Sequence, residues 1–246
     1  GRALRASCRS AAHHDAYPPV RFEFPTALYR LMEKIGIIDY GMGNLHSLGK
    51  SLERVAADQR VIISYDPETL LDCDRLVLPG VGGVRACMDE LRRLELNDLV
   101  IEAARKRPLL GVCLGMQVLL ERSEENGGVP ALGLIQGDVL RFPDPPADTE
   151  GERLKVPHMG WNRVHQTQAH PVWNGVPDDS WFYFVHSYYA SPQNPAHVLG
   201  STEYVTTFAA AVARDNVVGF QFHPEKSQAV GLQLLANFAA WDGETP

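Results

Sequence analysis

The segment at residues 108–117, with the sequence PLLGVCLGMQ, constrains the fold of this chain more than any other. An apolar run ends in Gly-Val-Cys-Leu-Gly, and a segment with helical character follows. This order predicts a buried strand that turns sharply into a helix, with Cys113 at the turn. Glycines at 111 and 115 are needed because larger side chains would collide with the flanking strand and helix. We therefore expect an α/β fold with a cysteine at the carboxyl end of a strand.

Cys113 has the chemistry of a nucleophile at such a turn. A helix N-terminus favours the thiolate over the thiol, and its free N–H groups can stabilise an oxyanion. The alternative is a structural cysteine buried in a strand, which is common for this residue type. The pattern by itself does not separate the two interpretations.

A second segment, residues 217–225 with the sequence VVGFQFHPE, favours catalysis. It begins as a strand, and Pro224 biases the residue before it towards an extended conformation. Residues two apart in an extended chain point to the same side, so we expect His223 and Glu225 to face one another. Together with Cys113 they supply a nucleophile, a base and an orienting carboxylate. His186, at the end of an aromatic strand, is a rival base, but a lone histidine there is more often structural.

Strand and helix patterns alternate along the first half of the chain. Buried strands are expected at residues 34–39, 60–64 and 75–78, and helices follow them, the first capped by Asn44. This alternation predicts a doubly wound, mostly parallel sheet. Another helix is expected from Met116 to Arg122, which puts Gln117 and Glu121 on one face, and a last one at about residues 227–241. From residue 155 the pattern predicts a small antiparallel, strand-rich addition.

The glycine-rich loop at residues 79–83 follows the third strand and is expected beside Cys113. Its backbone can approach a reacting carbonyl closely, so Gly82 and the N–H of Leu114 are candidates for an oxyanion hole. An ordinary connection between a strand and a helix is the alternative. Gln117 is placed to hold a polar substrate group, and the residues after the aromatic strand, Ser187 and Tyr188, are further substrate contacts.

Composition excludes several classes of function. The net charge of −7 over 246 residues argues against a dominant nucleic-acid role, and no apolar run reaches the roughly 18 residues of a membrane span. The four cysteines form no C-x-x-C pair, so we expect no zinc site and a cytoplasmic, reducing setting. Residues 1–31 are basic, a composition typical of transit peptides. The alternative is that they form an upstream extension. We expect an extension that is disordered or not native and a single domain over residues 32–246.

The motifs at residues 79–82, 111–117 and 222–225 resemble those of the class I, or triad, glutamine amidotransferases. Two further stretches, IDYGMGN at 38–44 and PHMGWN at 157–162, resemble the glutaminase subunits of imidazole glycerol phosphate synthase. The resemblance runs from about residue 34 to the C-terminus. This family often carries a charged or polar residue where the chain has Gly83.

The resemblance implies glutamine hydrolysis through a thioester on Cys113, without a cofactor or metal. It also implies a partner, a HisF-type (β/α)₈-barrel synthase subunit, that receives the ammonia in a heterodimer and makes imidazole glycerol phosphate and aminoimidazole carboxamide ribotide in histidine biosynthesis. The stretch containing Trp161 lies near that interface in the family, so Trp161 is the first candidate for a partner contact. The alternatives are a glutaminase of another synthase, a stand-alone γ-glutamyl cysteine hydrolase, and a glutamine sensor with an idle site.

Overall fold

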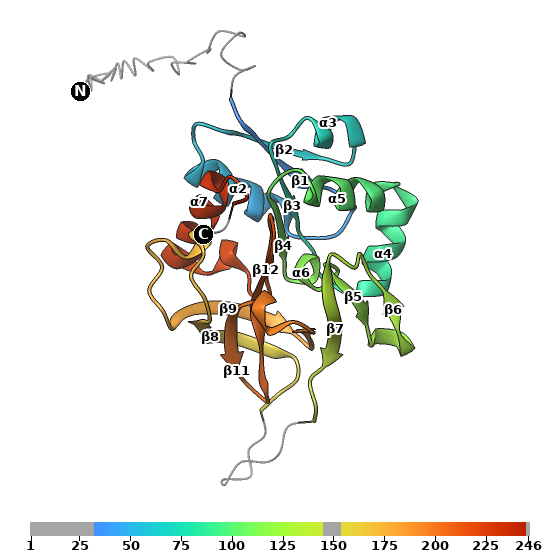
Figure 1. The fold of residues 1–246 in the computed structure, drawn as a ribbon, viewed down its shortest axis with the longest axis vertical. Coiled ribbons are helices and arrows are strands. Elements are labelled where there is room, and N and C mark those ends of the chain that lie inside the picture. The colour runs from blue at the N-terminus through green and yellow to red at the C-terminus, as the bar shows by residue number, and fades with distance from the viewer. Residues whose placement is uncertain (1–31, 145–153, 245–246) are drawn as a thin grey trace, which may run out of the picture. The chain divides into compact units, whose positions relative to one another are not determined.

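The strands of the described part of the chain, residues 32–144 and 154–244 of a computed structural model, join into one mixed sheet (Figure 1). The extension expected over residues 1–31 lies outside the described residues. The path through the sheet is β2-β1-β3-β4-β13-β12-β10-β7-β5-β6, with β11, β8 and β9 branching from β12. The fold is therefore of the expected α/β class, with parallel and antiparallel parts.

The parallel half of the sheet holds the two strands that lead into the motifs. Its members are β1 (Lys34–Ile38), β2 (Arg60–Ser64), β3 (Arg75–Leu78), β4 (Leu109–Val112) and β13 (Val217–Phe220). All residues of β3, β4 and β13 are buried, as their continuous apolar runs require in a sheet covered on both faces. Val112 pairs with Phe220, so the segments after β4 and β13 leave the sheet side by side.

The antiparallel half continues the same sheet rather than forming a separate layer. Its strands are β12 (Thr207–Arg214), β10 (Tyr188–Pro192), β7 (Ile135–Arg141), β5 (Leu120–Ser123) and β6 (Val129–Pro130), with β5 and β7 parallel to each other. β11 (Val198–Glu203) joins β12 to β8 (His158–Gln166), which forms an antiparallel pair with β9 (Ser180–His186).

Helices cover both faces of the parallel half (Figure 1). α2 (Leu45–Val55) and α7 (Gln228–Ala240) share one buried cluster with Ile35, Ile37 and Leu110. α3 (Pro67–Leu71), α4 (Val84–Arg93) and α5 (Leu96–Ala104) share the other with Leu76 and Leu109. Neighbouring residues of a strand thus enter different cores, which is the alternation that a doubly wound sheet imposes.

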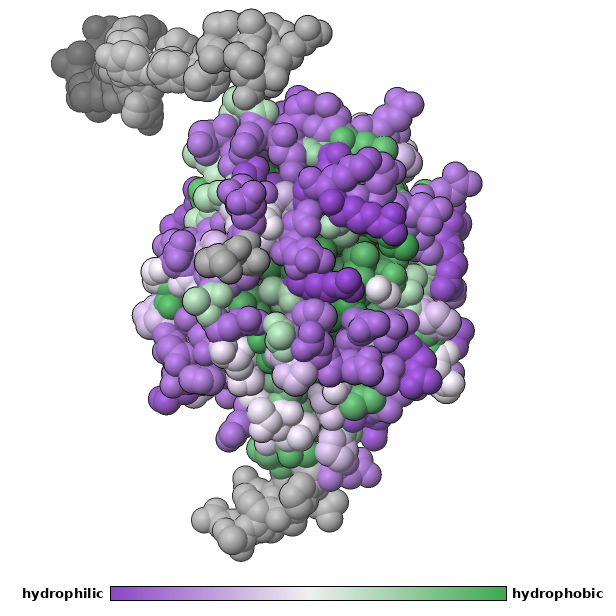
Figure 2. All heavy atoms as spheres, viewed as in Figure 1, coloured by the Kyte–Doolittle hydropathy of each residue, from purple (hydrophilic) through white to green (hydrophobic). Residues whose placement is uncertain are grey.

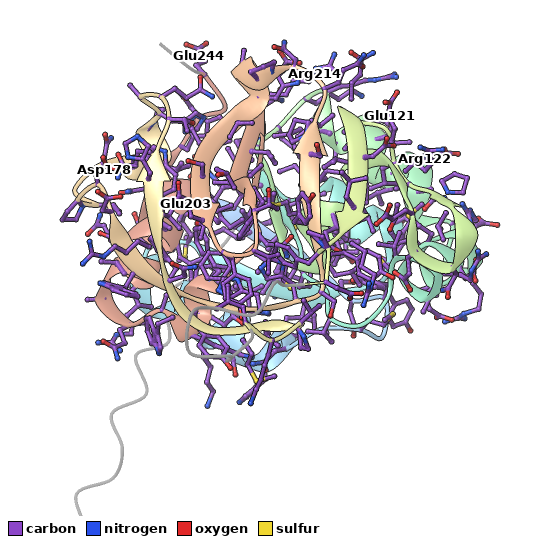
Figure 3. The ribbon with its side chains drawn as sticks, turned by 90° about the horizontal axis from the view of Figure 1, so that it is seen from below. Glu121, Arg122, Asp178, Glu203, Arg214 and Glu244 are labelled. Carbon is purple, nitrogen blue, oxygen red and sulfur yellow. The ribbon has the colours of Figure 1, made fainter. Side chains whose placement is uncertain are left out.

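One local prediction is wrong, and another is confirmed in position only. The helix expected over residues 116–122 is only the single turn α6 (Leu114–Gln117), because the carbonyls of residues 118–120 accept hydrogen bonds from residues 132–135. Glu121 therefore lies on β5 and is exposed (Figure 3). Its carboxylate accepts a hydrogen bond from the N–H of Gly137 at 3.1 Å. Asn44 does occupy the N-cap position of α2, but its side chain makes no capping hydrogen bond.

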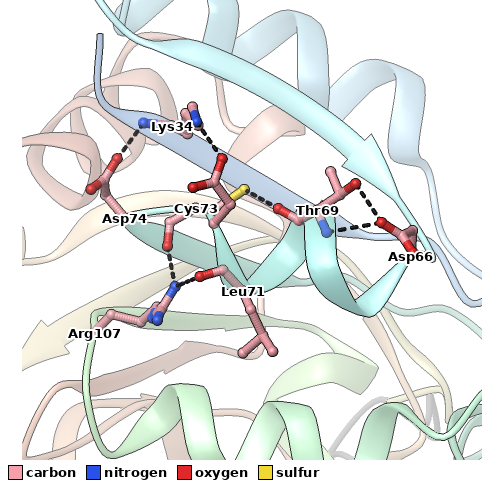
Figure 4. A network of polar contacts seen from close by, with 8 residues as sticks. Lys34, Asp66, Thr69, Leu71, Cys73, Asp74 and Arg107 are labelled. Atoms are coloured by element: carbon pink, nitrogen blue, oxygen red, sulfur yellow. Dashed lines mark hydrogen bonds and ion pairs between the residues drawn. The ribbon is translucent and has the colours of Figure 1, made fainter. Parts of the chain in front are cut away.

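A polar network fastens the amino end of β1 to α3 (Figure 4). The N–H of Lys34 donates to Asp74 at 2.7 Å, and Arg107 donates to the carbonyl of Cys73. The Cys73 thiol is buried and lies 3.3 Å from the carbonyl oxygen of Thr69, and burial raises the pKa of this thiol to about 11. Cys73 is thus a structural cysteine, at the end of the sheet opposite Cys113.

Polar side chains dominate the surface in the view of Figure 2, and hydrophobic ones show mainly between them. Four short 3₁₀ segments complete the described elements: η1 (Glu125–Gly127), η2 (Pro171–Trp173), η3 (Pro195–His197) and η4 (Pro224–Lys226). Among the helices of the described residues, none is both long enough and apolar enough to cross a bilayer.

Candidate active site

Cys113 stands at a sharp turn between β4 and α6. Its backbone has φ 54° and ψ −109°, a conformation that residues other than glycine rarely adopt. A Cβ at Gly115 would overlap the carbonyl oxygen of Leu78, and a Cβ at Gly111 would lie 2.7 Å from the carbonyl oxygen of Gly115. Both glycines are therefore required by close packing, and the strand–turn–helix arrangement expected for a nucleophile is present.

His223 and Glu225 meet as expected at the end of the neighbouring strand. Nδ1 of His223 lies 2.9 Å from Oε1 of Glu225, and both side chains are only 3% exposed. The N–H of His223 donates to the carbonyl of Tyr183 at 2.9 Å, which fixes the backbone against β9. Nε2 of His223 has no hydrogen-bond partner among the described residues, so this nitrogen is left for the thiol of Cys113 or for substrate.

The electrostatic setting of His223 favours the imidazolium. Burial alone lowers its pKa, but the nearby sulfur of Cys113 and the hydrogen bond and charge of Glu225 outweigh burial and raise the pKa to about 9. The ring is therefore mainly charged at neutral pH. A charged imidazole beside a cysteine stabilises the thiolate, which is the reactive form of the sulfur.

The glycine-rich loop after β3 lies against the turn at Cys113. A Cβ at Gly80 would come within 2.8 Å of the Cβ of Leu114, so the loop and the start of α6 touch closely. Gly82 has φ +93°, which favours glycine, and it lines the same cavity as Cys113 and Leu114. Leu114 is the first residue of α6, so its N–H has no acceptor within the helix. Both oxyanion candidates thus line the cavity that contains Cys113.

A cavity of about 470 Å³ opens over Cys113, large enough for an amino acid. Its lining includes each sequence-predicted oxyanion and substrate residue together with the nucleophile and base: Gly82, Cys113, Leu114, Gln117, Ser187, Tyr188 and His223. Glu225 stands behind His223 and does not line the cavity.

Glu125 is a cavity residue that the sequence did not point to. It belongs to η1, yet its Oε2 accepts the N–H of Val84 at 2.7 Å, at the start of α4. A Cβ at Gly83 would overlap Oε1 of Glu125, so the carboxylate occupies the space beside this glycine. Among the described residues it is the one carboxylate that lines the cavity. No local motif marks it, because its position depends on a contact across 42 residues of sequence.

Gln117 is buried, and both N–H groups of its amide are engaged within the protein. They donate to the carbonyl of Tyr188 at 2.8 Å and to Oε1 of Gln221 at 3.0 Å. Only the amide oxygen of Gln117 remains for substrate, which makes it an acceptor. Gln221, also missed by the sequence, is fully buried, and its Nε2 lies 3.8 Å from the sulfur of Cys113.

His186 also lines the cavity, but its ring nitrogens face the protein. Nδ1 lies 2.8 Å from the carbonyl oxygen of Tyr188, and Nε2 lies 3.1 Å from Nδ1 of His158. Burial lowers the pKa of His186 to about 3, so the ring is neutral. With both nitrogens engaged, His186 is unsuited to deprotonate Cys113, which supports the choice of His223 as base.

Trp161 lies on the outer face of the β8–β9 pair and is 43% exposed. Its ring packs edge-on against Tyr183 with centroids 6.1 Å apart, and Nζ of Lys226 lies 5.8 Å from the Tyr183 centroid. Met159 and Trp181 on the same two strands are 63% and 49% exposed. Trp161 is therefore a surface aromatic, as a partner contact requires.

Comparison with known proteins agrees with this geometry. The family model for class-I glutamine amidotransferases matches residues 36–240. The chain is 57% identical over 212 residues to the imidazole glycerol phosphate synthase subunit HisH of Methylococcus capsulatus, covering 86% of this chain and 98% of that protein. It is 54% identical to the HisH subunit of Nitrosococcus oceani, covering 86% and 99%.

The chain belongs to the class I glutamine amidotransferases, in the HisH family.

Solved structures support the fold of this amidotransferase. A putative GMP synthase protein from Thermoplasma acidophilum matches with a TM-score of 0.63 at 20% identity, covering 85% of this chain and 93% of that one. A further glutamine amidotransferase structure matches with a TM-score of 0.62 at 16% identity, covering 84% and 99%. At these identities the likeness concerns the fold alone, and the expected α/β amidotransferase architecture is confirmed.

Proposed function

We propose that this chain is the glutaminase subunit of an imidazole glycerol phosphate synthase and supplies ammonia to a separate barrel-type synthase subunit. The observation that carries the proposal is the meeting of Cys113, His223 and Glu225 at one edge of the sheet, in a chain whose close relatives are named as this subunit.

The reaction follows from the positions of the side chains. The sulfur of Cys113 attacks the carboxamide carbon of glutamine, and the oxyanion is held by the N–H of Leu114 and the backbone at Gly82. His223 gives its Nε2 proton to the departing nitrogen, so ammonia leaves and a γ-glutamyl thioester remains. A water then attacks the thioester carbon and passes a proton to Nε2 of His223. The C–S bond breaks, which releases glutamate and restores the thiolate of Cys113 beside the charged His223. Glu225 keeps Nδ1 protonated throughout and stabilises the imidazolium.

Binding of glutamine uses the polar groups that remain free at the cavity wall. The carboxylate of Glu125 and the amide oxygen of Gln117 are both acceptors, and together they suit the α-ammonium group. Ser187 and Tyr188, which also line the cavity, are assigned to the α-carboxylate through their N–H and hydroxyl groups. A substrate held by these groups presents its side-chain amide to Cys113.

The ammonia acceptor docks on the outer face of β8 and β9. Met159, Trp161 and Trp181 are exposed there, and large exposed aromatic side chains are favoured anchors of interfaces. The ring of Tyr183 contacts Trp161, and the carbonyl of Tyr183 accepts the N–H of His223. Tyr183 therefore connects this face to the catalytic base. A shielded path is useful because free ammonia is mostly protonated, and hence unreactive, near pH 7.

The domain and setting are part of the same proposal. We assign the amidotransferase domain to residues 32–246 and regard residues 1–31 as an extension without catalytic groups. Cys73, Cys87 and Cys113 are all free, in keeping with a reducing, cytoplasmic setting. Removal of residues 1–31 is expected to leave the rate of glutamine hydrolysis in the complex unchanged.

The test is Cys113→Ala in a complex with a barrel subunit of the pathway. Glutamine-dependent synthesis is expected to disappear, while synthesis with added ammonium salt continues at close to the original rate. Loss of both activities would show that Cys113 is structural. Full glutamine hydrolysis by the isolated chain, without stimulation by a substrate-loaded barrel, would instead favour a stand-alone hydrolase.

A further inference from the structure

Two buried histidines outside the catalytic triad face each other between the β8–β9 surface and the cavity. His158 begins β8 and His186 ends β9, and they are 3% and 6% exposed. Nδ1 of His158 lies 3.1 Å from Nε2 of His186. The proposed reaction uses neither ring. Burial lowers the pKa of His158 to about 4, so like His186 it is neutral at pH 7.

The surroundings fix which nitrogen of each ring carries the proton. The carbonyl of Tyr188 can only accept, so Nδ1 of His186 is the donor in their 2.8 Å contact. In a neutral ring Nε2 of His186 is then an acceptor, and Nδ1 of His158 must donate to it. Nε2 of His158 is left as an acceptor for the amide of Asn162 at 3.4 Å. That amide also donates to the carbonyl of Glu203, the last residue of β11, at 2.9 Å.

The same hydrogen bonds continue to the nucleophile. The carbonyl of Tyr188 accepts from Gln117 as well as from His186. Gln117 donates its second N–H to Gln221, and Nε2 of Gln221 points at the sulfur of Cys113 from 3.8 Å. A continuous chain of contacts therefore runs from Asn162, next to the exposed Trp161, to the reacting atom. Every donor and acceptor in it has one assignment, and donors from both sides, His186 and Gln117, converge on the carbonyl of Tyr188.

We propose that this hydrogen-bonded chain, with the pair His158–His186 at its centre, couples occupation of the β8–β9 face to the position of the Cys113 sulfur. The proposal rests on the proposed function. His158 and His186 act as positioning residues, because the hydrogen bonds of both rings go to other groups of the protein. A partner that shifts the start of β8 changes the His158–His186 contact, and the shift reaches Gln117 and Gln221 through the shared carbonyl.

Two substitutions at His158 separate coupling from packing. His158→Phe keeps a ring that can stack on Phe184 and Tyr204, whose centroids lie 4.8 and 4.0 Å away, but removes both hydrogen bonds. His158→Asn keeps a donor near Nδ1 but loses the ring. The readout is the ratio of glutaminase rates in the complex with and without the barrel's nucleotide substrate. Couplings between sites commonly amount to about 5- to 150-fold, so we expect His158→Phe to reduce the ratio at least about fivefold.

The expected rank orders are opposite. His158→Phe unfolds at the higher temperature but couples less, and His158→Asn unfolds at the lower temperature but retains more of the ratio. His165→Gln, a change of an exposed histidine on the same strand, is the matched control and leaves the ratio unchanged. The proposal is overturned if the two variants rank the same way in both measurements, or if neither alters the ratio.

A direct measurement on the chain alone reads the hydrogen-bond directions. Nitrogen-15 NMR of the histidine rings at pH 7 is expected to show His158 and His186 neutral and protonated at Nδ1. Protonation at Nε2 in either ring would overturn the proposed chain. If instead the wild-type complex shows no glutaminase activity while the NMR result holds, then the proposed function has failed and the chain of contacts has not.

Discussion

Replacement of Glu225 by Gln tests the electrostatic role of the orienting carboxylate. The pKa of His223 lies at about 9 in the folded protein against 6.5 for an ordinary histidine. Proton binding at this ring therefore contributes about 3 kcal/mol to the free energy of unfolding. Cys113 and Glu225 both raise the pKa of His223, and burial opposes them. One hydrogen bond to a charged group is worth roughly 1.5–3 kcal/mol. We expect Glu225→Gln to lose about that amount below pH 6.5.

The sign of the pH dependence follows from the raised pKa. The stabilisation is complete below pH 6.5, where the unfolded histidine is also charged, and it is lost as the pH rises through about 9. Above that pH the ring is neutral, so the difference in stability between the wild type and Glu225→Gln shrinks. Urea unfolding of both proteins at pH 6 and at pH 9.5 measures this difference in the free energy of unfolding.

Two further readouts support the assay. In Glu225→Gln the pKa of His223, followed by proton NMR, is expected to move towards 6.5. The rate at which iodoacetamide alkylates Cys113 at neutral pH is expected to fall. Glu53→Gln, which changes an exposed carboxylate on α2, is the matched control and alters none of these quantities. A stability difference that stays constant between pH 6 and 9.5, or grows, would refute the reasoning.

Three further outcomes are expected. Gly115→Ala prevents folding because the added Cβ overlaps the Leu78 carbonyl, which a loss of soluble yield would show. Gly49→Ala, whose Cβ lies 3.4 Å from the nearest side chain, stabilises α2 by up to about 1 kcal/mol, which thermal unfolding measures. Trp161→Ala weakens binding of the barrel subunit by roughly tenfold or more without lowering the unfolding temperature, and a collapse of that temperature would place the ring in the core. Glu125→Gln raises the KM for glutamine about tenfold with little change in kcat, and an unchanged KM would remove Glu125 from the ammonium site.

The sequence alone was sufficient wherever the chemistry is local. The spacing of Gly111, Cys113 and Gly115 predicted the turn, because the clashes that forbid larger residues involve strand, turn and helix within a few positions. His223 and Glu225 are two residues apart and meet as predicted, but not through an extended chain, because the backbone turns after His223 into the 3₁₀ segment η4. The alternation of buried strands and helices likewise predicted the parallel half of the sheet.

Contacts between distant segments were beyond local patterns. Residues 116–122 have helical character, yet hydrogen bonds from residues 132–135 turn their second half into a strand. Glu125 and Gln221 reach the site across 42 and 108 positions from their partners Gly83 and Cys113. The contact between His158 and His186 also depends on the pairing of β8 with β9.

What the sequence by itself determined about this protein is the class of fold and the choice of candidate nucleophile and base, since short-range sterics and backbone geometry decide them. Only the tertiary structure decided which polar groups face the cavity and which are consumed inside the protein. A buried donor must find an acceptor wherever the packed chain provides one, and that acceptor is set by the three-dimensional arrangement of strands rather than by neighbours in sequence.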